Sequence, residues 1–517
     1  MKKLIAIIFL FSLAGCSKKF TETESLTQIA SENFWKSEQD AQLAINGIYD
    51  VLQDRALYSG NLNITAGLTM FDCLGDNLFN NYQWQGPGNF MTGIITPSHG
   101  LFNGIWVSSY RGIARANAAI ENIEKMPLSL INQDKKNALF GQALFLRALF
   151  YFNLAVYYED VPLITKVQAL EDAYVVKNTY AEVKAQIIAD LKAAADILPV
   201  SYPSAQYGYA TKGAALGLLA RFHLYNKEWQ DVVTVTTTLM TLGYSLNTSY
   251  AQLFTELGET SREIVFSVRF NQDVSNNGEL LSATFTGNPA IDRNPMPNMV
   301  KDYYCTDGRP ITSSPLYNPG TPTNNAAQKN NRDPRLTASV YFRGDIWLTD
   351  LNRAFATTPT TYGLKKYIRT TSVSASGIAA FSPGGQDFIV IRYADVLLMR
   401  AEALTELNQL TDVYGLVNQV RQRVNMPKVQ NVEGASLSQN AMRNVVRHER
   451  RVELAFEGLR YFDLKRWGDI QNAFNRARAD KVPGYAPIYL PGKSEVFPIP
   501  LNDLNVNSNL VQHPAWQ

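Results

Sequence analysis

Three glutamates one helical turn apart, Glu449, Glu453 and Glu457, have a spacing that could support chemistry. Two carboxylates at a suitable separation can serve as the acid and the base of glycoside hydrolysis. Like charges on one helix face also repel unless cations lie between them, and Arg450 and Arg460 each lie three residues from one of these glutamates. We therefore interpret the set as a partly buried ion network that holds helix pairs together, with a glycosidase acid-base pair as the alternative.

Other sequence motifs typical of enzymes are either incomplete or absent. Gly492-Lys493-Ser494 is similar to the end of a phosphate-binding loop, but Pro487 stands where such a loop requires glycine. The sequence contains neither Gly-x-Ser-x-Gly nor His-Glu-x-x-His, and we interpret Arg392 and Asp395 as a salt bridge at a helix start. The histidines lie far apart and without metal-ligand neighbours, at His99, His223, His448 and His513. We therefore expect no enzyme activity, no cofactor and no metal site.

Two irregular stretches combine aromatic rings with polar side chains. Sugar binders use such sets, because rings cover the apolar faces of a sugar while amides, carboxylates and guanidinium groups bond its hydroxyl groups. The first stretch holds Asp72, Asp76, Asn77, Asn80, Asn81, Tyr82 and Trp84, and the second holds Tyr303, Tyr304, Arg309, Tyr317 and Trp347. Trp84 lies between two glutamines and before Gly86-Pro87-Gly88, so it is the best candidate for an exposed platform. For each aromatic, the alternative is that it packs a loop onto the body of the protein.

The N-terminus has the pattern of a lipoprotein leader. Met1-Lys2-Lys3 is positively charged, Leu4–Leu13 is apolar but too short to span a bilayer, and Leu13-Ala14-Gly15-Cys16 matches the lipobox of bacterial lipoproteins. We expect residues 1–15 to be a signal peptide and Cys16 to anchor the mature chain through its acyl groups. An ordinary secretory signal with a chance cysteine is the alternative. Which leaflet the anchored chain faces is left undecided by the sequence, because Ser17-Lys18-Lys19 lacks the acidic residues that often follow the cysteine of surface-exported lipoproteins.

The bulk composition argues against nucleic acid as a partner. The chain has 517 residues with 48 basic and 46 acidic side chains, a formal net charge of +2, whereas nucleic-acid binding needs a basic face. After the leader, no stretch approaches the length of apolar chain that spans a bilayer, so we expect the rest to lie beside the membrane. Three cysteines are too few for a disulfide framework, and whether Cys73 and Cys305 pair stays open.

Helices must position most of these residues. Apolar residues at helical spacing predict helices at about 137–158, 179–198, 211–226, 228–242, 391–407, 410–424 and 445–467. Their loose recurrence in pairs is typical of tetratricopeptide-like hairpins, which we expect at about 30–55, 100–242 and 391–467. The stretches at about 59–100 and 244–390 are irregular, with β-prone runs such as Ile264–Val268, and should carry the ligand face. The predicted fold class is mostly α, a scaffold of helical hairpins with a loop-rich region and a few short strands.

Short motifs follow one another along nearly the whole chain. They are Glu32-Asn33-Phe34-Trp35, Asn46-Gly47-Ile48-Tyr49, Ile113-Ala114-Arg115-Ala116-Asn117, Phe145-Leu146-Arg147-Ala148-Leu149-Phe150-Tyr151-Phe152, Val161-Pro162-Leu163, Asp333-Pro334-Arg335-Leu336, Ile391-Arg392-Tyr393-Ala394-Asp395-Val396-Leu397-Leu398, Glu449-Arg450-Arg451-Val452-Glu453-Leu454-Ala455-Phe456-Glu457-Gly458 and Phe497-Pro498-Ile499-Pro500. In this order the motifs resemble the SusD/RagB family, the surface nutrient-binding lipoproteins of Bacteroidetes. The resemblance implies one SusD-like domain over residues 16–517.

The resemblance also implies a function. Members of that family cap a TonB-dependent, SusC-like transporter barrel at the outer membrane, capture a nutrient outside the cell and deliver it without a cofactor. We expect an oligosaccharide or polysaccharide ligand, with peptides, as in the RagB branch, as the alternative. An anchored polysaccharide hydrolase and a helical-repeat scaffold without a small ligand are further alternatives. The ligand-facing loops carry no family motif, so no binding residue is transferred from the resemblance.

Overall fold

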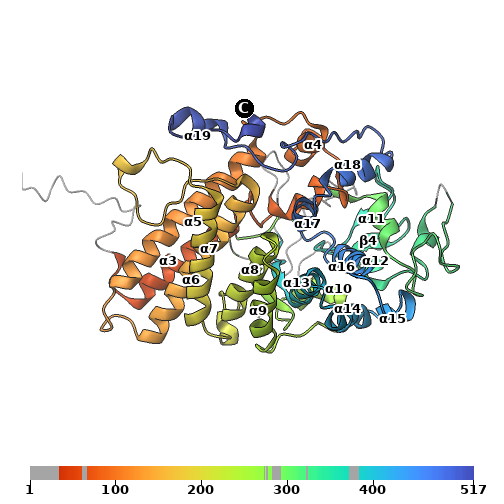
Figure 1. The fold of residues 1–517 in the computed structure, drawn as a ribbon, viewed down its shortest axis with the longest axis horizontal. Coiled ribbons are helices and arrows are strands. Elements are labelled where there is room, and N and C mark those ends of the chain that lie inside the picture. The colour runs from red at the N-terminus through yellow and green to blue at the C-terminus, as the bar shows by residue number, and fades with distance from the viewer. Residues whose placement is uncertain are drawn as a thin grey trace, which may run out of the picture.

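The computed structural model describes residues 34–60, 67–272, 274, 277–281, 293–321, 324–371 and 384–517. The predicted signal peptide and Cys16 lie outside these residues. Figure 1 shows long helices gathered at one end of the molecule and shorter helices with loops and strands at the other. The described part is mostly helical with a few short strands, which confirms the predicted fold class.

The long helices pack against their neighbours along the chain. They are α3 (Glu38–Leu52), α5 (Gly100–Lys125), α6 (Gln133–Tyr158), α7 (Tyr180–Ile197), α8 (Lys212–Tyr225), α9 (Trp229–Met240), α13 (Tyr393–Glu406) and α14 (Leu410–Arg423). Contacts join α5 with α6, α6 with α7, α8 with α9 and α13 with α14. Between residues 34 and 55, where a hairpin was expected, the structure has the single helix α3, which packs against α5 and α6 from later in the chain.

Side-chain caps explain where several of these helices begin. Asn132 accepts a hydrogen bond from the N–H of Lys135 at the start of α6. Thr179 and Glu182 form a reciprocal capping box at the start of α7, and Thr211 caps α8. Each cap satisfies a backbone donor that the first turn of a helix leaves without a partner.

Helix α6 lies at the centre of the helical end. It contacts α3, α5, α7 and α8, and nearly every residue from Leu139 to Tyr158 is buried. Among the described residues, α6 is the one helix long and apolar enough to cross a membrane, and 94% of that stretch is buried inside the molecule. A helix that is apolar all round and enclosed on all sides is a core helix.

Shorter elements fill the rest of the fold. The helices are α4 (Gly86–Thr92), α10 (Tyr250–Leu253), α11 (Pro297–Asp302), α12 (Pro334–Ser339), α15 (Val429–Val432), α16 (Gln439–Glu453), α17 (Arg460–Trp467), α18 (Ile470–Ala479) and α19 (Leu501–Val506), and Leu68–Leu74 forms the 3₁₀ helix η2. The strands are β1 (Leu78–Asn80), β2 (Ile264–Val268), β3 (Arg293–Pro295), β4 (Val340–Tyr341), β5 (Ile346–Leu348), β6 (Arg353–Ala354), β7 (Gly363–Leu364) and β8 (Phe388–Arg392). They pair as four antiparallel two-stranded sheets, β1–β3, β2–β8, β4–β7 and β5–β6.

The helix predicted at about 445–467 is wrong in one respect, because the chain breaks between α16 and α17. Phe456 and Gly458 have φ angles of 68° and 78°, a left-handed conformation that ends a helix. A Cβ on Gly458 would lie 2.7 Å from the carbonyl oxygen of Leu68, so only glycine fits there. The break sets Glu457 outside the helix that carries Glu449 and Glu453.

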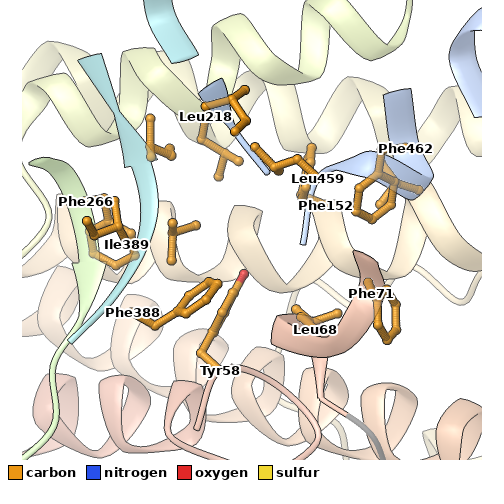
Figure 2. Packing of buried hydrophobic residues seen from close by; sticks show 14 of the residues in the cluster. Tyr58, Leu68, Phe71, Phe152, Leu218, Phe266, Phe388, Ile389, Leu459 and Phe462 are labelled. Carbon is orange, nitrogen blue, oxygen red and sulfur yellow. The ribbon is translucent and has the colours of Figure 1, made fainter. Parts of the chain in front are cut away.

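One hydrophobic core joins the two ends of the molecule. Figure 2 shows Tyr58 beside Phe388 of β8, with ring centroids 5.9 Å apart. Phe266 of β2 contacts Phe145 of α6 at 4.8 Å. Segments far apart in sequence therefore bury their side chains together. Cys73 and Cys305, whose pairing the sequence left open, are both buried and are not joined by a disulfide bond.

Candidate ligand-binding surface

Tyr82 and Trp84 form an exposed aromatic pair on the loop between β1 and α4. Their side chains are 38% and 54% exposed, and their ring centroids lie 6.2 Å apart with the planes tilted by 45°. Asn81, beside them, is half-buried. The exposure predicted for Trp84 is confirmed, and Tyr82 is exposed beside it.

Hydrogen bonds and a close backbone contact fix this loop. The Asn80 amide donates to the Gln85 side chain at 2.8 Å across the loop, and the Asn89 amide donates to the carbonyl of Trp84 at 3.1 Å. A Cβ on Gly88 would lie 2.5 Å from the Cα of Gln83, so α4 begins directly against the loop. A loop that is held at both ends loses little conformational entropy when its aromatic rings contact a ligand.

The structure places the polar residues that precede this loop in the interior, which corrects their predicted contact with a ligand. Asp72 is fully buried and accepts hydrogen bonds from the Asn77 side chain and from the N–H groups of Phe456 and Gly458. Burial raises its pKa to about 6, although these hydrogen bonds oppose the shift. Asp72 therefore anchors the chain break after α16 and does not reach the surface.

Asp76 is buried as well. Arg460, Arg476 and Arg451 lie 2.8, 2.6 and 3.2 Å from its carboxylate oxygens. Burial disfavours its charged form, but Arg451 and Arg460 outweigh this and hold its pKa well below the usual value. Three arginines pair with this carboxylate in the interior. The prediction that Asp76 contacts a ligand is therefore wrong, and Asp76 is a buried ion-pair partner.

The second predicted set divides in the same way. Tyr303 and Trp347 are fully buried, so they belong to the core and not to a ligand surface. Tyr304 is half-buried and stacks on His448 with ring centroids 3.9 Å apart. Tyr317 is half-buried beneath the guanidinium group of Arg332, at 5.3 Å. Arg309 is exposed.

The two stretches meet in the interior through Arg451. This side chain pairs with Asp302, next to Tyr303, at 2.9 Å and with Asp76 at 3.2 Å. It also donates to Asn77 at 3.1 Å and to Asn298 at 2.5 Å. Asp76 and Asn77 of the first set, together with Asp302 and Asn298 near the second, thus hold the loops together from inside.

Comparisons with known proteins decide the family. A family model described as "SusD family" matches residues 262–516, and one described as "Starch-binding associating with outer membrane" matches residues 19–224. The chain belongs to the SusD family. Two SusD-like proteins of Formosa agariphila are 26% and 27% identical to this SusD-family chain, over 100% and 90% of its length and 98% and 92% of theirs.

Solved structures of SusD-like proteins share the fold. A SusD-like carbohydrate-binding protein from Bacteroides fragilis has a TM-score of 0.77 at 27% identity, covering 92% of this chain and 100% of that chain. A laminarin-binding SusD-like protein has a TM-score of 0.68 at 24% identity, covering 93% of this chain and 99% of that chain. Surface glycan-binding protein A from Bacteroides fluxus has a TM-score of 0.72 at 20% identity, covering 92% and 99%.

In this SusD-family chain the three spaced glutamates are buried ion-pair partners. Their cations come from other elements: Glu449 pairs with Arg335 and Arg421, Glu453 with Arg335, Arg392 and Arg423, and Glu457 with Arg392 and Lys366. Burial opposes ionisation of Glu449 and Glu453, but the surrounding arginines lower the pKa of both. Buried carboxylates held ionised by arginines are poor proton donors, which argues against the acid-base alternative for Glu449 and Glu453.

The predicted ion network is confirmed, but the two cations expected in it, Arg450 and Arg460, pair with other carboxylates, and the separately predicted Arg392–Asp395 salt bridge is not formed. Arg450 pairs with Asp395 and Asp463 at 2.6 and 2.8 Å, and Arg460 pairs with Asp76. Arg392 does not pair with Asp395. Asp395 instead forms an ion pair with Arg221 at 2.6 Å. Neighbours along a helix form weak, exposed pairs, whereas these buried charges are matched across the core.

Two groups of residues were missed from the sequence. Ligand atoms of His223, Glu228 and Asp231 lie within 4.8 Å of one another, but Lys184 pairs with Glu228, and we assign the group as an ion pair. The loop between α7 and α8 lines a cavity of about 790 Å³ with several tyrosines. The repeated tyrosines of this loop are the sequence feature that could have indicated the cavity.

Proposed function

We propose that this SusD-family chain binds an oligosaccharide or polysaccharide at the outer surface of the cell. The observation that carries the proposal is the exposed Tyr82–Trp84 pair on a loop fixed at both ends. Aromatic rings stack on the apolar faces of sugars, and the neighbouring Asn81 amide can bond the hydroxyl groups at their edges. Tyr304, Arg309 and Tyr317 are secondary candidates, because each keeps exposed surface in the second stretch.

The platform is tested by changing one ring. We expect Trp84→Ala to weaken binding to a polysaccharide by about tenfold or more, since a stacked aromatic contributes on the order of 1 kcal/mol beyond its buried area. Trp84→Tyr should keep most of the affinity, because the ring remains. Affinity electrophoresis against starch, laminarin, mannan and xylan gives the measurement. Leu170→Ala, at an apolar side chain that is 87% exposed elsewhere, is the matched control.

Two outcomes would contradict this part of the proposal. Unchanged affinity of Trp84→Ala, with a polysaccharide that the parent protein binds, would remove the platform. Binding of peptides but of none of the polysaccharides would change the ligand class to peptides.

We further propose that Cys16 anchors the chain in the outer membrane, facing outward, where it delivers the ligand to a SusC-like, TonB-dependent barrel. The lipobox and the family resemblance support this proposal. A C-terminally tagged chain recovered from gently solubilised membranes should bring the barrel with it, and Cys16→Ser should move the chain out of the membrane fraction. Proteolysis of intact cells should remove the domain. Reproducible recovery of the chain alone would count against the transporter partnership.

A further inference from the structure

A tyrosine-lined cavity lies away from the Tyr82–Trp84 loop. Helices α7, α8 and α9 stand next to one another (Figure 1), and the α7–α8 loop, the turn after α9 and strand β2 enclose a space of about 790 Å³. Its lining includes Tyr202, Tyr207, Tyr209 and Tyr244. A second cavity of about 350 Å³ adjoins it, sharing Tyr207 and Tyr209 and reaching Tyr49 of α3. The volume falls in the range of roughly 300–1,000 Å³ that is typical of small-molecule sites.

The hydroxyl groups of these tyrosines are tied to the protein, so the rings are held in place. The Tyr202 hydroxyl accepts from the Gln142 amide at 3.0 Å, and the Tyr209 hydroxyl donates to Asn46 at 3.0 Å. The Tyr244 hydroxyl shares a hydrogen bond with Thr211 at 3.1 Å. Fixed rings with satisfied polar ends can act as apolar platforms without further ordering when a ligand binds.

The rings also lie against one another. The ring centroids of Tyr202 and Tyr209 are 5.8 Å apart with the planes at 71°, and Tyr209 contacts Tyr49 at 5.5 Å. Arg269 covers one face of Tyr207 at 4.7 Å. All of these tyrosines are half-buried, which leaves part of each ring open to solvent. The cavity wall therefore has apolar ring surfaces that solvent can reach, unlike the rings of the core.

Polar side chains without partners stand at the rim. Gln206, Thr260 and Arg262 are exposed, and within the described part of the chain their side chains make no hydrogen bond or ion pair. Arg262 is the one charged group among the described residues that line the larger cavity, and none of them is acidic. Ring platforms beneath free amide, hydroxyl and guanidinium donors match the apolar faces and hydroxyl rims of neutral sugars.

From this juxtaposition we propose that the tyrosine-lined cavity is a second binding site for a neutral oligosaccharide, separate from the Tyr82–Trp84 platform. The proposal rests on the proposed glycan-binding function and extends it. Two sites on one chain would hold a long polysaccharide at two points, so that release from one leaves it bound at the other.

The test counts bound sugars on the full chain. Native mass spectrometry with neutral hexasaccharides of α-1,4-glucan, β-1,3-glucan, β-1,4-mannan and β-1,4-xylan gives the number bound per chain. We compare the parent protein with Trp84→Ala, Tyr202→Ala and the Trp84→Ala/Tyr202→Ala combination. Tyr202→Phe keeps the ring and loses only the Gln142 hydrogen bond. Tyr174→Ala, at an exposed tyrosine outside the cavity, is the matched control.

We expect two hexasaccharides on the parent protein, one on each single alanine variant and none on the combination. A double variant, Gln206→Ala with Arg262→Ala, changes only free side chains and should weaken binding at the cavity by about tenfold without affecting folding. Hydrogen exchange of residues 200–211 should slow when sugar binds.

The outcomes separate the two proposals. One bound hexasaccharide that is lost in Trp84→Ala and unaffected by the Tyr202 and Gln206/Arg262 variants would overturn the second site and leave the platform. One that is lost in Tyr202→Ala and unaffected by Trp84→Ala would support the cavity and contradict the platform. No binding of any hexasaccharide would overturn both.

Discussion

At the scale of single residues, buried charges are matched across the fold. Arg392 shows the pattern, because its guanidinium group pairs with Glu263, Glu453 and Glu457 from three segments. Removing one partner from such a group leaves an unpaired charge in the core, which costs on the order of 3–5 kcal/mol. The glutamates of α16 are therefore positioned for stability and for the geometry of the loops, and not for chemistry on a substrate.

Two other carboxyl groups titrate in an unusual range. Glu259 accepts a hydrogen bond from the N–H of Asp387 at 2.9 Å, and the Asp387 carboxylate accepts one from the Tyr207 hydroxyl at 3.1 Å. Burial, and then the charge of Asp387, raises the pKa of Glu259 to about 8, and burial raises that of Asp387 to about 6. Glu256 and Arg269 are the other charged groups that act on Glu259. The folded chain thus keeps a proton here that the unfolded chain loses near pH 4.5.

This difference in proton binding predicts a pH-dependent stability. The contribution of Glu259 is fully present below about pH 4.5 and is lost as the pH rises towards 8, because the unfolded state binds fewer protons in that range. Glu259→Gln keeps the acceptor oxygen and cannot ionise. We expect its free energy of unfolding, relative to the parent protein, to rise by roughly 1–3 kcal/mol between pH 5 and pH 8.

Urea denaturation at several pH values measures this difference. Glu171→Gln, at an exposed glutamate, is the control and should show no comparable change. A constant difference between Glu259→Gln and the parent protein across the range would show that Glu259 is not protonated in the folded state.

At the scale of elements, β1, the aromatic loop and α4 form one unit. Strand β1 is buried and paired with β3, so the chain leaves the core at Asn80, and Pro87 lies at the start of α4. Between these fixed points the loop has room for only a few residues, and Tyr82 and Trp84 point outward. Gly88 makes the short connection possible because its backbone lies directly against Gln83.

We expect Gly88→Ala to reduce glycan affinity nearly as much as Trp84→Ala. The alanine Cβ would lie 2.5 Å from the Cα of Gln83 and 2.6 Å from the carbonyl oxygen of Gln83. The backbone must shift to relieve this clash, and that shift would move the aromatic rings. Overpacking of this kind also costs about 1–3 kcal/mol of stability. Affinity electrophoresis and thermal denaturation measure the two effects.

Gly415→Ala is the matched control for this change. Gly415 lies within α14, and a Cβ there meets nothing within 4 Å. Alanine should raise stability by about 0.5–1 kcal/mol, because glycine weakens a helix interior, and should leave affinity unchanged. If Gly88→Ala bound glycan as the parent protein does, the loop would not depend on this contact.

At the scale of the whole molecule, the helical end depends on the C-terminal part of the chain. Tyr157 of α6 packs on Phe462 at 4.8 Å and on Phe497 at 5.0 Å, and its carbonyl accepts from the N–H of Phe497. Arg221 of α8 pairs with Asp395 of α13. The helical hairpins therefore do not close a core of their own.

We expect residues 34–242 alone to lack a cooperative fold. The fragment would expose Tyr157 and leave Arg221 without its carboxylate, although its helices could still form. Near-ultraviolet circular dichroism and thermal scans, with residues 34–517 as the control, measure this. A sharp unfolding transition and fixed aromatic signals in the fragment would show that the hairpins fold independently.

The sequence by itself determined the class of fold and the positions of most of the long helices, whereas α3 and α5 were covered only by broader hairpin ranges. Apolar spacing and the turn residues between helices are local signals, so they can be read from neighbouring residues. The motifs around Arg392 and Glu453 identified the family in the same way, and the position of Trp84 between glutamines marked it as exposed.

Only the tertiary structure decided which polar residues are inside and with whom they pair. Asp76 and Trp84 lie eight residues apart in similar surroundings, yet arginines from α16, α17 and α18 enclose the first and solvent reaches the second. The tyrosine cavity likewise depends on β2 folding back beside the α7–α8 loop. Burial and ion pairing are set by contacts between residues hundreds of positions apart, and local sequence carries no record of them.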